Sequence, residues 1–172
     1  GSDFGKFVEP LNALHAAHGV FFVTGNHEGY LGLEEPLSVL GKTRIRVLDN
    51  EVVEIAGLQV VGVSFPEHDR QEESRKALTL QGMIDPDKPG ILMFHTPTDV
   101  VQSSSDRSRQ QRRTYLSPDT TFSFAHEHGI DLQLSGHTHR GQFFPFTRLT
   151  RWIFNGYDYG LHRQGRFQIY VS

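Results

Sequence analysis

Leu132-Gln133-Leu134-Ser135-Gly136-His137-Thr138-His139 is the stretch that decides the fold. The part before Ser135 is typical of a short strand in a sheet interior, and the part after it is polar and rich in histidine. Two earlier segments share this organisation. The run 20–24 is followed by Gly25-Asn26-His27-Glu28, and the run 90–94 is followed by His95-Thr96-Pro97. Because ligands of open α/β sheets bind at the carboxyl ends of strands, the three polar clusters are expected to converge on one site.

The segments around these clusters alternate between strand-like and helix-like patterns, which predicts an α/β domain. Helices are expected over 7–18, 34–40, 72–80 and 117–128, the last with Ser117 as its N-cap. Strands are expected over 20–24, 44–48, 51–55, 58–64, 90–94 and 131–134, and a strand pair over 152–171. The runs 20–24, 90–94 and 131–134 indicate strands buried on both faces, and 25–29 indicates a loop.

Composition bounds the class of protein. The chain has 172 residues, enough for one domain with its own core, and 37% of them are hydrophobic. It has no cysteine, which excludes disulfides and thiolate metal sites. No apolar run approaches the roughly 18 residues of a membrane span, and a net charge of −3 gives no support for a nucleic-acid partner. Gly1-Ser2 looks like a tag remnant, and the basic stretch 103–113 is expected to be a flexible loop.

Histidine is the residue type that points to chemistry, because the chain holds ten of them and histidine is the commonest metal ligand. The strand-end clusters contribute five candidate side chains, namely Asn26, His27, His95, His137 and His139. Imidazole nitrogens with an amide oxygen suit Zn, Mn, Fe or Ni better than Ca or Mg alone. Each cluster alone has an ordinary explanation, a turn or a hydrogen-bonded histidine, but three of them together favour a metal site.

The same clusters resemble the third, fourth and fifth motifs of the calcineurin-like metallophosphoesterases, here Gly25-Asn26-His27-Glu28, Phe94-His95-Thr96-Pro97 and Ser135-Gly136-His137-Thr138-His139. The stretch 132–142 is most similar to the branch of bacterial membrane-linked phosphohydrolases that includes YkuE-type proteins. This resemblance implies a fold of the α/β class, a sandwich of two mixed β-sheets flanked by helices, with the N-terminal strands missing.

The resemblance also implies a role for each site residue. Asn26, His95 and His137 would ligate the second metal of a pair, and His139 would ligate the first. His27 would be catalytic: it would face the phosphate and help to protonate the leaving oxygen. Glu28 would orient His27, and Arg140 is a candidate contact to a substrate phosphate.

The sequence departs from the family pattern at its N-terminal side, because neither an Asp-x-His motif nor a Gly-Asp-x-x-Asp motif is present. The chain is therefore expected to be one truncated domain of a longer parent. The parent would hydrolyse phosphate esters or anhydrides with two divalent transition metals, Mn, Fe, Zn or Ni. This chain alone would bind at most one metal and be inactive. The alternative is a non-catalytic metal-binding or interaction module.

The resemblance implies a phosphorylated small-molecule or lipid-linked substrate and a bacterial, membrane-associated parent, while these residues themselves are expected to be soluble. Self-association through the truncated sheet edge is a further expectation. His15 and His18 are predicted to be surface residues, and His126 and His128 to lie at a helix end. The aromatic residues of 143–146 are predicted to form core or a pocket wall.

Overall fold

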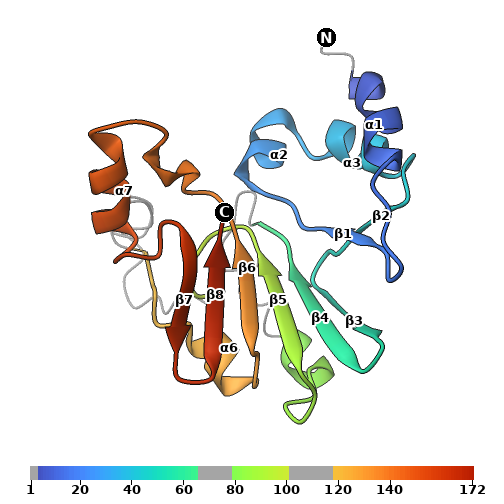
Figure 1. Cartoon of the computed structure of the whole chain (residues 1–172). Coiled ribbons are helices and arrows are strands. Elements are labelled where there is room, and N and C mark those ends of the chain that lie inside the picture. The colour runs from blue at the N-terminus through green and yellow to red at the C-terminus, as the bar shows by residue number, and fades with distance from the viewer. Residues whose placement is uncertain (1–3, 66–78, 101–117) are drawn as a thin grey trace.

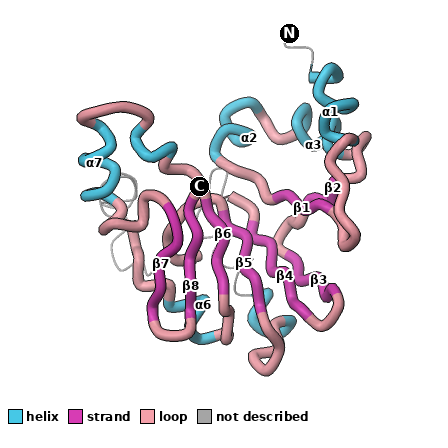
Figure 2. The backbone as a smooth tube through the Cα atoms, viewed as in Figure 1, coloured by secondary structure: helices cyan, strands magenta, loops and turns pink. Residues whose placement is uncertain are grey.

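The computed structural model describes residues 4–65, 79–100 and 118–172, and it has two β-sheets with helices around them (Figures 1 and 2). The strands are β1 (Val20–Phe22), β2 (Ile45–Val47), β3 (Glu51–Ile55), β4 (Leu58–Val63), β5 (Gly90–Phe94), β6 (Leu132–Ser135), β7 (Gly160–Gln164) and β8 (Phe167–Val171). The α-helices are α1 (Val8–Asn12), α2 (Asn26–Leu31), α3 (Glu34–Leu40), α6 (Ser123–Glu127) and α7 (Phe146–Ile153). Short 3₁₀ turns are η1 (Phe4–Phe7), η2 (Leu80–Met83) and η3 (His139–Gly141).

The larger sheet has six strands in the order β3-β4-β5-β6-β8-β7, and it is mixed. Strands β4, β5, β6 and β8 run parallel, while β3 and β7 are antiparallel edge strands joined to their neighbours by hairpins. The smaller sheet pairs β1 with β2 in parallel. The expected mixed α/β architecture is confirmed, and the parallel centre brings the carboxyl ends of β5 and β6 to the same edge (Figure 1).

The two faces of the large sheet are covered differently. One face carries the main core, in which Leu92, Phe122 and Ile169 are fully buried. Helix α6 and the turn η2 contribute side chains to the same core. The small sheet packs on the opposite face of β3 and β4, where Leu48 meets Val53 and Val60. At Gly62 this approach is so close that a Cβ atom would lie 2.2 Å from Cβ of Leu48, so only glycine fits there.

The opposite face of the other half of the sheet is open in the described part of the chain. A cross-strand row joins Leu134 of β6 to Tyr170 of β8 and Leu161 of β7, and these side chains are 37%, 43% and 53% exposed. The prediction that 20–24 and 131–134 are buried on both faces is therefore wrong. Strand β1 is only partly buried, because it is paired to β2 alone, and β6 alternates between buried and exposed positions.

Most strand predictions are confirmed, whereas two predicted helices are shorter. The helix expected over 7–18 ends at Asn12, because the Asn12 side chain bonds the segment before β2 instead. Its amide oxygen accepts from the N–H of Arg44 at 3.0 Å. The helix expected over 117–128 begins only at Ser123. Its first N–H groups are capped by the buried carboxylate of Asp99, whose Oδ2 lies 2.5 Å from N of Ser123.

Four other segments differ from expectation or cannot be compared. The expected loop 25–29 is the start of α2, and the first part of 152–171, expected to be strand, contains the end of α7. The predicted helix over 72–80 and the loop 103–113 lie mostly outside the described residues. Within the described residues, no helix is both long enough and apolar enough to cross a membrane.

Candidate metal centre

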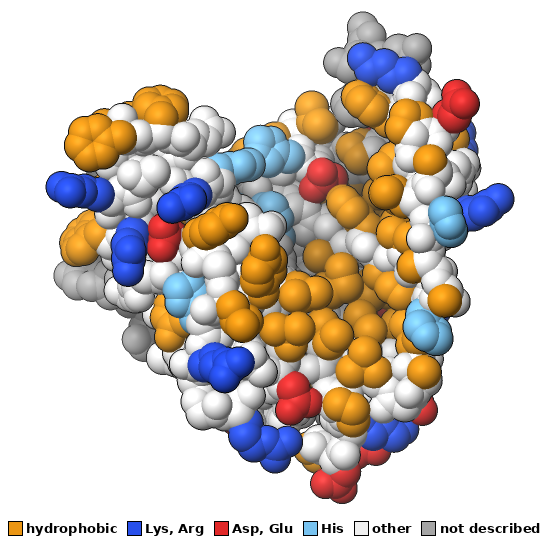
Figure 3. Space-filling model, viewed as in Figure 1, with side chains coloured by type: hydrophobic (Ala, Val, Ile, Leu, Met, Phe, Trp, Pro, Cys, Tyr) orange, Lys and Arg blue, Asp and Glu red, His pale blue; other side chains and the backbone are white. Residues whose placement is uncertain are grey.

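Three chain segments meet above the carboxyl ends of β1, β5 and β6, between α2 and η3 (Figure 1). Hydrogen bonds tie these strand ends together. The hydroxyl of Ser135 donates to the carbonyl of Phe94 at 2.8 Å, and N of Gly136 donates to the carbonyl of His95 at 2.9 Å. In the space-filling view, histidine side chains gather at the rim of a hollow on this side (Figure 3). The convergence predicted from the sequence is therefore present.

The closest polar atoms of the site form a triangle of three side chains. Oδ1 of Asn26 lies 2.7 Å from Nε2 of His95 and 3.3 Å from Nδ1 of His137, and the two histidine nitrogens are 3.1 Å apart. Ligands about 2.1 Å from a common ion lie about 3.0 Å apart at right angles and about 3.4 Å apart at the tetrahedral angle. The three donor atoms therefore have the spacing of one face of a metal coordination shell.

The donor set also fits a transition metal chemically. Two imidazole nitrogens and one amide oxygen are neutral donors suited to Zn, Mn, Fe or Ni. Among the described residues, no three His, Cys, Asp or Glu side chains are grouped as a metal site, and the third donor atom beside the two imidazoles is Oδ1 of Asn26. The residues present fit a divalent metal, with the remaining positions of its shell open to water or substrate.

The helix start at Gly25 positions this triangle. A Cβ atom on Gly25 would lie 2.7 Å from Cε1 and Nδ1 of His95, so the imidazole occupies the space that any other residue would fill. The carboxylate of Glu28 accepts from the Gly25 N–H at 2.6 Å and completes a capping box at the start of α2. Glu28 therefore bonds the backbone from which α2 begins, and its role in orienting His27 stays a prediction.

His95 is a partly buried member of the triangle. Its ring meets the edge of Phe65, with ring centroids 5.5 Å apart, and Phe65 also stacks on His137 at 6.2 Å. Burial lowers the pKa of His95 from its ordinary value, an effect that His27 and His139 reinforce and Glu28 opposes. The ring is therefore held in the neutral form that can ligate a metal.

The segment after β6 reaches the site through an unusual backbone path. His137, His139 and Arg140 have φ values of 71°, 48° and 50°, in the left-handed region that non-glycine residues rarely occupy. The buried Thr138 between them anchors the turn, since its hydroxyl donates to the carbonyl of Asp158 at 2.6 Å. Such strain in a closely tied turn is typical of functional sites.

The remaining predicted residues lie beside the triangle. The rings of His27 and His139 are in edge contact, with centroids 6.0 Å apart. Arg140 instead places its guanidinium over the ring of Tyr159, 4.8 Å from the centroid. His15 and His18 are exposed, as predicted, and His126 and His128 lie at the end of α6.

Two residues of the site were not predicted from the sequence. Phe65 contacts the rings of His95 and His137, and its N–H donates to the hydroxyl of Thr24 at the end of the β1 segment at 3.0 Å. Gln133 is 1% exposed and donates to the carbonyls of Thr96 and Thr98, which fixes the segment after His95. In the sequence, the only indication of a special role for Gln133 is that a polar residue occupies an apolar strand position. The sequence gives no such indication for Phe65.

Comparison with known proteins places these features in context. Residues 1–141 match the model of a protein family described as "Calcineurin-like phosphoesterase". An uncharacterized metallophosphoesterase of Helicobacter pylori J99 is 38% identical over 97% of this chain and 40% of its own length. A Bos taurus protein named "transmembrane protein with metallophosphoesterase domain" is 29% identical over 96% of this chain and 36% of its own. The chain thus spans about 40% of the length of these relatives.

Solved structures share the fold. The Thermus thermophilus protein TT1561 aligns with a TM-score of 0.53 at 16% identity, over 98% of this chain and 68% of its own. A Staphylococcus aureus protein described as a putative 5'-nucleotidase aligns with a TM-score of 0.55 at 12% identity, over 96% of this chain and 34% of its own. At such identities the likeness concerns the fold alone.

Proposed function

This chain belongs to the calcineurin-like phosphoesterase family, and from that premise we propose that it supplies one metal site and the leaving-group acid of a metal-dependent phosphohydrolase. The parent would hydrolyse a phosphate ester or anhydride. The single observation that carries the proposal is the donor triangle of Asn26, His95 and His137, with separations of 2.7 to 3.3 Å.

In this proposal the triangle holds one divalent metal, and His139 is a ligand to a second. When bound, such ions supply positive charge that polarises the phosphoryl group and lowers the pKa of a coordinated water. The chain's own task is to keep the three donors in place: Gly25 leaves room for the His95 ring, and the strained turn presents His137. A site assembled in advance in this way loses little energy to reorganisation.

His27 is the proposed proton donor to the leaving oxygen. It stands in the first turn of α2, directly after the ligand Asn26, and its ring contacts both His139 and Tyr30. It is therefore next to the triangle without being part of it. General acids of this kind contribute about 10²–10⁴-fold to a rate. Arg140 remains a proposed phosphate contact only if its side chain leaves the Tyr159 ring.

The substrate class follows from the family and not from a pocket. A phosphorylated small molecule or a lipid-linked phosphate is proposed. The second possibility draws support from the Bos taurus relative, whose name describes a transmembrane protein. A membrane-associated parent of the bacterial, YkuE-type branch is proposed on the same ground and on the similarity of residues 132–142.

A second candidate is a module that binds metal without catalysis. The observation in its favour is that the 172 residues contain no Asp-x-His and no Gly-Asp-x-x-Asp motif. For the enzyme, the carboxylates that bridge two ions would have to come from elsewhere in the polypeptide. Sequencing the coding region upstream discriminates between the candidates: both motifs there support the enzyme, and a natural start near residue 3 supports the module.

The proposal is tested on the full-length protein that contains this chain. Hydrolysis of bis(4-nitrophenyl) phosphate with added Mn²⁺ is expected for the wild type and expected to fall to background for His137→Ala. His18→Ala, at an exposed turn, is the matched control and should keep full activity. Full activity of His137→Ala would contradict the proposal.

A further inference from the structure

The segment 143–152, which follows η3, presents an apolar surface to solvent. Phe143, Phe144 and Phe146 are 61%, 73% and 49% exposed, and Leu149 and Trp152 are 47% and 70% exposed. The prediction that the aromatic residues of 143–146 form core or a pocket wall is therefore wrong. Single exposed apolar residues are ordinary, but five within ten positions form a patch that requires a partner.

Helix α7 is oriented with its apolar side outward. Phe146, Leu149 and Trp152 recur at a spacing of three, which places them along one side of the helix, and all three are exposed. Thr147, Thr150 and Ile153 are the partly buried positions of the same helix. A helix that packs on a core buries its large apolar side chains, so the exposed row of Phe146, Leu149 and Trp152 does not serve the fold.

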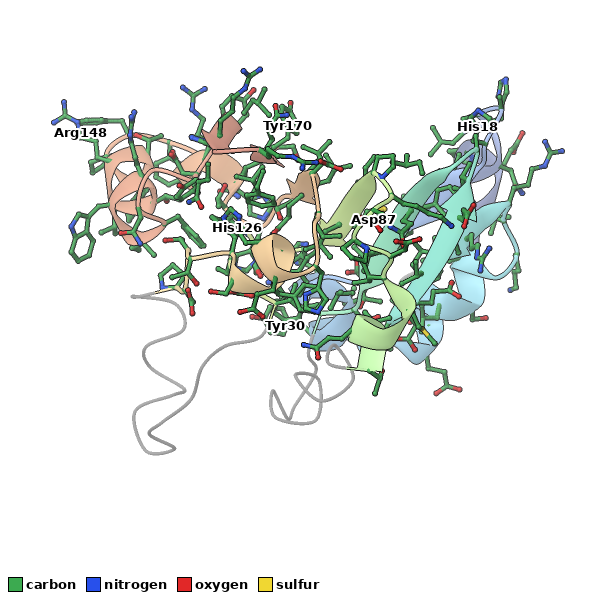
Figure 4. All side chains as sticks on the ribbon, turned by 90° about the horizontal axis from the view of Figure 1, so that it is seen from below. His18, Tyr30, Asp87, His126, Arg148 and Tyr170 are labelled. Atoms are coloured by element: carbon green, nitrogen blue, oxygen red, sulfur yellow. The ribbon has the colours of Figure 1, made fainter. Side chains whose placement is uncertain are left out.

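The same segment is basic. Arg140, Arg148 and Arg151 lie in or near it, and no Asp or Glu occurs between residues 131 and 158. The guanidinium of Arg148 lies 5.8 Å from the ring centroid of Phe144, and in Figure 4 Arg148 is at the far end of the molecule, directed away from the sheet. Cationic side chains thus flank the exposed aromatic rings.

The surface is held in place by close packing beneath it. A Cβ atom at Gly141 would lie 2.6 Å from the backbone of Phe146, so η3 and the start of α7 are in tight contact. The rings of Phe143 and Phe146 are in edge contact at 5.3 Å, and Phe154 at the end of α7 is buried. The exposed rings are therefore presented by an ordered element.

From these observations we propose that Phe143, Phe144, Phe146, Leu149, Trp152, Arg148 and Arg151, hereafter the aromatic-basic surface, dock α7 on an anionic lipid bilayer. Amphipathic helices with Trp, Phe and Leu on one side and arginine on the other bind in the plane of the membrane interface. Aromatic rings suit the headgroup region, and each arginine near an anionic surface adds about fivefold in affinity.

Charge favours a bilayer over a second copy of the chain. A symmetric dimer through this surface would bring two sets of arginines together without any acidic residue in the segment to pair with them. Docking would also bring the metal centre close to the membrane surface, because His139 begins η3 and α7 starts five residues after Gly141. The inference does not rest on the proposed catalytic function.

Trp152 is the only tryptophan of the chain, so its fluorescence reports on this surface directly. Titration of the chain with phosphatidylcholine vesicles containing phosphatidylglycerol should shift the emission to shorter wavelength, and vesicles of phosphatidylcholine alone should bind much more weakly. Arg148→Ser/Arg151→Ser should lower the affinity about 25-fold at low salt and less at high salt. Arg163→Ser/Arg166→Ser, on the β7–β8 hairpin, should leave it unchanged.

Vesicle flotation distinguishes binding through the aromatic-basic surface from binding through the open sheet face. Phe143→Ser/Phe144→Ser should abolish flotation, while Leu161→Ser/Tyr170→Ser, on the open sheet face, should not. Circular dichroism verifies that each variant is folded. The proposal is overturned if the sheet-face variant is the one that fails to float, or if Trp152 emission is unchanged by vesicles. It is also overturned if sedimentation shows a dimer that Phe143→Ser/Phe144→Ser dissociates.

Discussion

The backbone of Gly25 lies against the imidazole of His95, so closely that a Cβ atom at position 25 would be 2.7 Å from two ring atoms. These residues are 70 positions apart, and they come from the ends of β1 and β5, which belong to different sheets. The glycine of the first polar cluster therefore leaves room for the proposed ligand of the second. Because position 25 has no side chain, the His95 ring can lie against its backbone, with Nε2 2.7 Å from Oδ1 of Asn26.

Gly25→Ala should weaken metal binding without unfolding the chain. The added methyl group displaces His95, and loss of ligand orientation typically lowers metal affinity about 10–100-fold. Gly29→Ala is the matched control, because a Cβ there would meet no atom within 4 Å and alanine favours the helix. Isothermal titration with Zn²⁺ measures both variants. Equal affinities would show that the contact has no functional weight.

His137→Ala and His27→Ala should separate the ligand from the proton donor. His137 provides one corner of the triangle, so its removal should abolish binding of Mn²⁺ or Zn²⁺ to this chain. His27 contacts the rings of His139 and Tyr30 and lies outside the donor triangle, so its removal should leave binding intact. In the full-length protein His27→Ala should instead lower the rate about 10²–10⁴-fold. Loss of metal by His27→Ala would contradict these roles.

The metal-free chain should become less stable as the pH is lowered, because of His95. Burial lowers the pKa of the folded His95 below its ordinary value of 6.5, so below that pH the unfolded chain binds a proton that the folded chain does not. Stability is then greatest above about pH 6.5 and is lost as the pH falls through it. Thermal unfolding in EDTA measures this, and His95→Gln should reduce the slope. An unchanged slope would exclude His95 as its source.

Asp99→Asn should destabilise the chain through α6. The carboxylate is 2% exposed and accepts from the N–H groups of Ser123 and Phe124. Weakening charged hydrogen bonds of a buried group costs about 1–3 kcal/mol. Urea unfolding should show the loss, with Glu127→Gln, exposed on the same helix, as a neutral control. If Asp99→Asn leaves the free energy of unfolding unchanged, α6 does not need this cap.

Much of the fold was predictable because local patterns decide it. Helix α3 and strands β3 and β5 have the predicted ends, since apolar periodicity and turn residues mark both ends of each. The three strand-end clusters also converge as expected, because a parallel sheet aligns the ends of β5 and β6. That part of the site follows from topology and needs no knowledge of side-chain packing.

The features that the sequence did not predict depend on distant partners. The start of α6 is fixed by Asp99, which lies 24 positions before Ser123. Phe65 contacts His95 and His137 only after the sheets have packed. An apolar stripe such as that of α7 predicts burial in any soluble domain, and only the structure shows it facing solvent.

This chain alone should show phosphodiesterase turnover at background, even with Mn²⁺ added. It contains three neutral donors for one ion and no Asp-x-His or Gly-Asp-x-x-Asp motif for a second. Two ions about 3.5–4 Å apart are what the reaction uses. Metal analysis with a chromogenic phosphodiester assay measures this. Two tightly bound ions per chain with robust hydrolysis would contradict it.

The most direct test of the metal centre is a crystal of the chain grown with Zn²⁺ and measured by anomalous scattering at the zinc edge. We expect one peak per chain, about 2.0–2.2 Å from Oδ1 of Asn26, Nε2 of His95 and Nδ1 of His137. A zinc ion bound elsewhere, with these three side chains still hydrogen-bonded to one another, would contradict it.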